Sequence, residues 1–164
     1  MISEVPVIRP SGEGEAIWYA HNRITVKASA ESTGGAYGLV EAWLPAGEGP
    51  PLHIHHREDE AFWVLEGDFS LCCGERTFSA GPGAYVFLPR EVPHGFVVEG
   101  NAPGRLLVLL VPGGSERYFI EAGRPAEAEG LPPAGPLDFE LLERVAGKFG
   151  MEFVGPPLTP RTGQ

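Results

Sequence analysis

Three of the five histidines lie within four positions, in the segment GEGPPLHIHHREDEAFWVLEG that spans residues 47–67. Alternate residues of a β-strand point to the same face, so His53 and His55 should converge on one point and His56 should point away. Neutral imidazole nitrogens are common ligands of divalent metal ions. The spacing therefore indicates a metal-binding pair, although such a run can also be a solvated strand end.

An acidic trio follows these histidines, and any of its members could add a hard oxygen ligand: Glu58, Asp59 and Glu60. A further histidine, His94, opens the run HGFVV, in which Phe96 and Val98 share its face. Taken singly, the acidic trio is typical of a solvated turn and His94 of a structural histidine. Together with the histidine pair they form a more specific pattern, because glycines and prolines flank both segments.

Short apolar runs separated by turn residues indicate the elements that would position these side chains. The 23 glycines and 17 prolines are spaced between the runs, which favours many short strands and an all-β sandwich or barrel. The expected strands are 16–19, 23–28, 36–44, 52–55, 60–66, 68–73, 75–79, 85–88, 94–98 and 105–111.

Two helices are expected after the last of these strands. Residues 115–122 (SERYFIEA) offer Ser115 as an N-cap, and residues 138–149 (DFELLERVAGKF) offer Asp138. An apolar stripe on the second helix should pack on the outside of the β-core; it comprises Phe139, Leu142, Val145, Ala146 and Phe149.

Length and composition narrow the classes of function. A chain of 164 residues suits one domain. A net charge of −10 without a basic cluster argues against nucleic-acid binding. We expect no membrane span and no signal peptide. The adjacent Cys72 and Cys73 do not suggest a disulfide framework, which fits a reduced, cytoplasmic protein.

The histidine segment resembles the first motif of the cupin superfamily, G-x5-H-x-H-x3,4-E-x6-G. The positions of this motif are occupied by Gly47, His53, His55, Glu60 and Gly67. The second motif, G-x5-P-x-G-x2-H-x3-N, is matched by Gly83, Pro89 and His94. Glu91 stands where the family has glycine and Val98 where it has asparagine, and a non-glycine residue with positive φ at position 91 would be strained.

The resemblance, which is closest to small quercetin 2,3-dioxygenase-like cupins, implies a mainly β double-stranded β-helix with a short helical C-terminal extension. Residues 1–164 would form a single cupin domain. Its parts would be N-terminal strands (1–34), a barrel core with both motifs (35–112) and a helical extension (113–164). A homodimer is expected by the same analogy.

The resemblance also implies the metal ligands His53, His55, Glu60 and His94, with Glu58 as the rival carboxylate if the turn before Glu60 differs. Such a set leaves open positions on one divalent ion, which suits Fe, Mn, Ni or Co and allows Zn. We expect a dioxygenase of the quercetinase-like type acting on an aromatic or enolisable small molecule. Glu60 would be its catalytic base, and Phe62 and Phe96 would line the substrate pocket unless they are only core residues.

The sequence leaves two other classes of function open. One is a small-molecule-binding cupin that holds a metal but catalyses no reaction, because a fold does not fix a function. The other is a metal-dependent isomerase or lyase.

Overall fold

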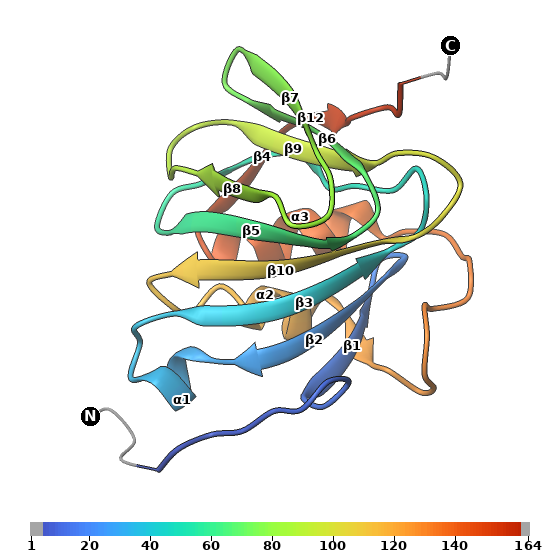
Figure 1. Ribbon diagram of the computed structural model, residues 1–164. Coiled ribbons are helices and arrows are strands. Elements are labelled where there is room, and N and C mark those ends of the chain that lie inside the picture. Colours follow the sequence, from blue (N-terminus) through green and yellow to red (C-terminus); the bar gives the residue numbers. More distant parts are fainter. Residues whose placement is uncertain (1–4, 162–164) are drawn as a thin grey trace.

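The computed structural model describes residues 5–161 as a two-layered β-fold. Residues 1–4 and 162–164, the ends of the first and last predicted segments, lie outside the described residues. Ten strands lie between residues 15 and 111 (Figure 1). They are β1 (Glu15–Tyr19), β2 (Asn22–Ala28), β3 (Gly38–Leu44), β4 (Pro51–His55), β5 (Asp59–Glu66), β6 (Phe69–Cys73), β7 (Arg76–Ala80), β8 (Tyr85–Leu88), β9 (His94–Val98) and β10 (Gly104–Val111).

The C-terminal part adds both helices and strands. It contains α2 (Arg117–Ala122), β11 (Arg124–Pro125), α3 (Phe139–Lys148) and β12 (Met151–Pro157), and a short helix α1 (Ala30–Thr33) lies between β2 and β3. All ten predicted strands and both predicted helices are confirmed to within a few residues. The elements α1, β11 and β12 were not predicted.

Two antiparallel sheets enclose the core. The larger has the order β11-β1-β2-β3-β10-β5-β8 and the smaller β12-β4-β9-β6-β7. Burial alternates along β3 and β10, because successive side chains point into the core and out of it. The largest fully buried side chains include Phe62, Phe69 and Tyr118. The mainly β fold with a C-terminal helix is therefore confirmed.

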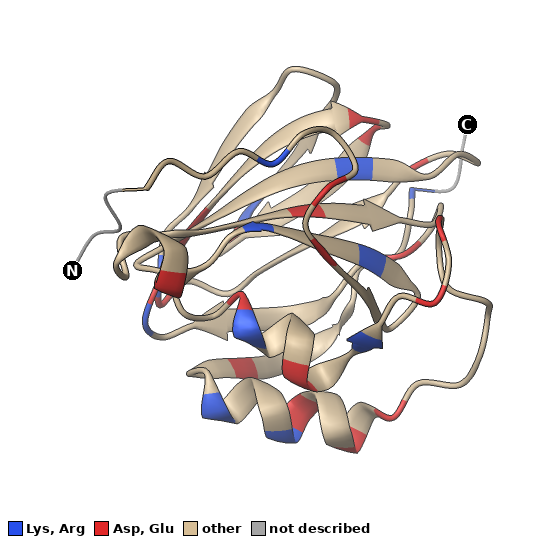
Figure 2. Cartoon of the chain, turned by 90° about the horizontal axis from the view of Figure 1, so that it is seen from below, with Lys and Arg blue, Asp and Glu red and all other residues tan. Residues whose placement is uncertain are grey.

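Helix α3 packs against the core through most of the predicted apolar stripe. The carboxylate of Asp138 caps the helix by accepting a hydrogen bond from the backbone N–H of Leu141. Leu142, Val145 and Ala146 are buried, whereas Phe139 is exposed. Acidic and basic residues share the outer surface of this helix (Figure 2).

No helix within residues 5–161 has the length and apolar character needed to cross a membrane. Cys72 and Cys73 are both free and partly buried. The structure thus agrees with the expectation that no disulfide supports this fold.

The turn before β9 keeps the backbone conformation that the second motif gives to glycine. Glu91 has φ of 66°, in the left-handed region that non-glycine residues rarely occupy. Its backbone N–H donates to the carbonyl of His55 at 2.9 Å, and its carboxylate contacts His56. The expected strain is therefore present, and these contacts hold the turn against β4.

We predict that the variant Glu91→Gly is more stable than Glu91→Ala. Both lose the contact with His56, but only alanine keeps a Cβ at a left-handed position, so glycine should gain about 1 kcal/mol in the free energy of unfolding. Urea denaturation followed by circular dichroism measures the difference. Equal unfolding midpoints would show that position 91 carries no backbone strain.

Candidate metal centre

Three strands from both sheets bring the predicted ligands together. His53 and His55 share a face of β4, and His53 lies directly opposite His94 on the neighbouring strand β9. Glu60 comes from β5 in the other sheet, and residues 56–58 form the turn that reverses its parity relative to His55. The group therefore spans the space between the two sheets.

The four side chains form a compact buried group that could hold a metal ion. Their potential ligand atoms all lie within 4.8 Å of one another. Glu60 Oε2 is 2.9 Å from His94 Nε2 and 3.2 Å from His55 Nε2. No member is more than 7% exposed.

Acceptors outside the group fix the orientation of each imidazole ring. His53 Nδ1 donates to the carbonyl of Pro51 at 2.7 Å, and His94 Nδ1 to that of Val92 at 3.1 Å. His55 Nδ1 lies 2.6 Å from the carboxylate of Glu58. All three rings therefore turn Nε2 toward the centre, which is the arrangement by which proteins orient histidine ligands.

The surroundings shift the pKa values of the two histidines of β4 in opposite directions. Burial, with the nearby His94 and His55, lowers the pKa of His53 to about 3. Burial also acts to lower the pKa of His55, but Glu60 and Glu58 outweigh it and raise that pKa to about 10. Burial opposes ionisation of Glu60, yet His55 and His94 bring its pKa well below the usual range. At neutral pH the group thus contains a carboxylate and a protonated His55.

These donors fit a divalent metal ion. Two ligands held about 2.1 Å from an ion at right angles to each other lie about 3 Å apart, close to the separations between Glu60 Oε2 and the Nε2 atoms of His55 and His94. Three imidazole nitrogens and one carboxylate oxygen suit Fe, Mn, Co, Ni or Zn. To bind an ion, His55 would have to release the proton that faces Glu60.

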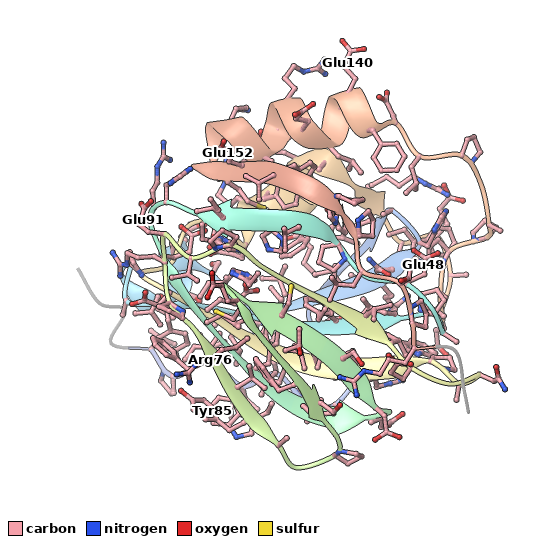
Figure 3. The ribbon with its side chains drawn as sticks, turned by 90° about the horizontal axis from the view of Figure 1, so that it is seen from above. Glu48, Arg76, Tyr85, Glu91, Glu140 and Glu152 are labelled. Atoms are coloured by element: carbon pink, nitrogen blue, oxygen red, sulfur yellow. The ribbon has the colours of Figure 1, made fainter. Side chains whose placement is uncertain are left out.

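The other polar residues of the histidine segment lie outside this group. Glu58 is 3% exposed and contacts His55 from behind the ring, so it positions His55. His56 points away, as expected, and bridges Glu91 and Glu152 at 2.9 and 2.8 Å, which raises its pKa. Figure 3 shows Glu91 and Glu152 on the same side of the molecule. Asp59 pairs with Arg90 at 3.1 Å.

A cavity of about 70 Å³ adjoins the candidate metal centre, and His53, His55 and Glu60 are among its lining residues. Phe96 lines it too. Phe62 is absent from the lining and packs in the core against Phe96, with ring centroids 5.1 Å apart. The remaining wall is mostly aliphatic and aromatic.

Four polar residues of the cavity lining escaped the sequence analysis: Tyr19, Asn22, Ser115 and Tyr118. Tyr19 and Asn22 belong to the hairpin of β1 and β2, Ser115 precedes α2, and Tyr118 lies within α2. The sequence predicts Ser115 as the N-cap of this helix, but the N-cap position is occupied by Glu116. No motif links these two distant segments, so only the fold shows that they share one cavity.

Comparisons with known proteins agree with this architecture. A protein-family profile described as "Cupin domain" matches residues 40–111. The chain is 26% identical to a quercetin 2,3-dioxygenase from Bacillus subtilis over 128 residues, covering 78% of this chain and 38% of that protein. It spans 38% and 59% of the lengths of the first two curated relatives that it matches.

Two solved structures show the same fold at low sequence identity. An RmlC-like cupin from Shewanella frigidimarina matches with a TM-score of 0.57 and 19% identity, over 68% of this chain and 96% of that one. A predicted oxalate decarboxylase from Thermotoga maritima matches with a TM-score of 0.58 and 19% identity, over 65% of this chain and 99% of that one.

We predict that metal binding releases at least one proton per ion at pH 7. With a pKa of about 10, His55 is protonated in the metal-free protein and must lose that proton to bind an ion, whereas His53 is already neutral. Affinity should rise at least about tenfold per pH unit between pH 7 and 9. Calorimetric titration with Mn²⁺ in buffers of different protonation enthalpy counts the protons.

The variant His56→Gln is the matched control, because His56 is exposed and outside the group. It should release the same number of protons as the wild type. Binding without proton release in the wild type would contradict the paired state of His55 and Glu60.

We further predict that Glu58→Gln and Glu60→Gln differ in their effect on metal affinity. Loss of the carboxylate that orients His55 should weaken binding by about 10- to 100-fold, and loss of the Glu60 carboxylate should weaken it more. Equilibrium dialysis with elemental analysis measures both, with the exposed Glu152→Gln as control. A larger loss in Glu58→Gln would make Glu58 the ligand.

Proposed function

Because this chain belongs to the cupin superfamily, we propose that it is a metal-dependent dioxygenase of the quercetinase-like type that acts on an enolisable or aromatic small molecule. The observation that carries this proposal is the buried group of three histidines and one glutamate at the wall of a largely apolar cavity. The quercetin 2,3-dioxygenase relative supports the reaction class.

In this proposal His53, His55, Glu60 and His94 hold one divalent ion. When bound, the ion supplies Lewis acidity and open coordination positions at the cavity wall. The protein supplies the rest. Glu58, Pro51 and Val92 keep the three rings in place, and the apolar lining keeps water away from the ligand.

Glu60 is the proposed catalytic base. It lines the cavity, so an enolic hydroxyl of a bound ligand can approach its carboxylate. Its contacts with His55 and His94 keep it ionised and hence able to accept a proton. Because the same contacts make Glu60 a weak base, uptake of that proton requires one of them to loosen.

The dimensions of the cavity favour a small ligand. The cavity volume of about 70 Å³ is well below the roughly 300–1,000 Å³ of pockets that take drug-sized ligands. An enolisable compound with a short carbon chain fits these dimensions. A flavonol, with its three rings, needs lining side chains to move. We therefore place short enolisable compounds ahead of flavonols as substrates.

The homodimer and the cytoplasmic location remain predictions. We also propose the division into N-terminal strands, barrel core and C-terminal extension. The C-terminal extension contains strand as well as helix, because β12 pairs with β4 and forms an edge of the smaller sheet.

We predict oxygen uptake by metal-loaded protein with short α-hydroxyketones or 1,3-diketones, and much slower uptake with quercetin. Untagged protein is loaded in turn with Fe²⁺, Mn²⁺, Co²⁺ and Ni²⁺ and checked by elemental analysis. An oxygen electrode follows consumption, and ¹⁸O₂ shows whether both oxygen atoms enter the product. The variant His53→Ala, which should lose the metal, is the control.

The same experiment separates the alternatives. Binding without oxygen uptake in every metal form would identify a binding protein and overturn the dioxygenase. Product formed under argon would identify an isomerase or lyase. Fully retained metal in both His53→Ala and His55→Ala would contradict the ligand set itself.

A further inference from the structure

A second set of polar side chains lines the cavity beyond the candidate metal centre. It consists of Tyr19, Asn22, Ser115 and Tyr118, and we call it the polar wall. Tyr19 and Asn22 are directly paired at the end of the first hairpin, and Ser115 precedes Tyr118 by three residues. In the larger sheet, β3 and β10 separate β2 from β5. Tyr19 and Asn22, and with them Tyr118, whose hydroxyl lies 2.7 Å from that of Tyr19, are therefore separated from Glu60 across the larger sheet.

Two atoms of the polar wall are buried without a hydrogen-bond partner: Asn22 Oδ1 and Ser115 Oγ. The Ser115 residue is only 6% exposed. Buried polar atoms are almost always hydrogen-bonded, because leaving them unpaired lowers stability. Such exceptions are expected at functional sites, where a ligand completes the hydrogen bonds.

The two tyrosines of the polar wall add a neutral donor. Their hydroxyls lie 2.7 Å apart, so one donates to the other and the accepting tyrosine keeps its own proton for a further bond. Burial raises the pKa of Tyr19 well above its usual value and that of Tyr118 to about 12. Both hydroxyls therefore stay protonated at neutral pH.

The charge of the lining limits what this wall can bind. Among the described residues that line the cavity, none is a lysine or an arginine, and the one acidic residue is Glu60. Glu60 is already paired with His55 and His94, so a carboxylate, phosphate or ammonium at the polar wall would be buried without a free opposite charge, which is strongly unfavourable. A hydroxyl both donates and accepts, so it can pair with either Asn22 Oδ1 or Ser115 Oγ.

We infer that the polar wall is a specificity subsite for an uncharged, hydroxyl-bearing group of the ligand. This inference rests on the proposed function in one respect, because it places the other, enolisable end of the ligand against His53, His55 and Glu60. The ligand is thus a short compound with a polar group at each end and an apolar middle.

Calorimetric titration under argon with three matched probes tests this subsite. The probes are 1-hydroxybutan-2-one, 1,4-dihydroxybutan-2-one and the 4-phosphate of the latter, added to Mn²⁺-loaded protein. The dihydroxy compound should bind about five- to tenfold more tightly than the monohydroxy compound, which is the factor given by about one net hydrogen bond. The phosphate should bind more weakly than either.

Variants of the polar wall should abolish this preference. In Ser115→Ala and Asn22→Leu the ratio of the two dissociation constants should fall toward one, whereas the exposed Ser79→Ala should keep the wild-type ratio. The melting temperature gives a second readout. Ser115→Ala removes an unpartnered hydroxyl, so it should unfold at the wild-type temperature or above, whereas a purely structural serine would lower it.

The inference and the proposed function fail in different ways. The inference is overturned if the wild type and Ser115→Ala show the same ratio, if the phosphate binds most tightly, or if no probe binds to metal-loaded protein. If elemental analysis shows that the wild type takes up no metal, the proposed function fails. The ratio measured on metal-free wild type and Ser115→Ala then still decides whether the polar wall selects a hydroxyl.

Discussion

The contact of one buried carboxylate with two imidazoles is the interaction on which the candidate site depends. Glu60 crosses from one sheet to reach His55 and His94 on the other. A charge buried this deeply is tolerated only when it is paired and hydrogen-bonded, so both sheets must hold their side chains in register. The carboxylates of Glu60 and Glu58 keep His55 protonated, whereas burial keeps His53 neutral. A metal ion that binds this group must therefore displace the proton of His55.

The supporting contacts explain why this arrangement is rigid. Pro51, Glu58 and Val92 each fix one ring through Nδ1, and two of these contacts use backbone carbonyls within two residues of the histidine. Glu91, in spite of its left-handed backbone, holds the β8–β9 turn against the end of β4. Local chain geometry therefore orients the rings before any ligand arrives.

The part of the structure that depends on local pattern could be predicted from the sequence. Alternating apolar residues between glycines and prolines gave the ten strands, and the i, i+2 spacing placed His53 and His55 on one face. Glu60 and His94 lie beside this histidine pair because of the order of the strands in the two sheets. No local sequence pattern contains that order, so only the family resemblance indicated the complete set of four ligands. Strand β12 was missed because its sequence, MEFVGPP, ends in residues typical of loops. The polar wall was missed because Asn22 and Ser115 meet the cavity only through tertiary structure.

The two functional surfaces of the cavity lie on separate stretches of the chain. The candidate ligands fall between His53 and His94, whereas the polar wall comes from the first hairpin and from the segment after β10. Substitutions in the outer stretches can therefore alter which compound is accepted while the donor set stays intact. Such a division lets evolution, or protein engineering, diversify selectivity on an unchanged reactive core.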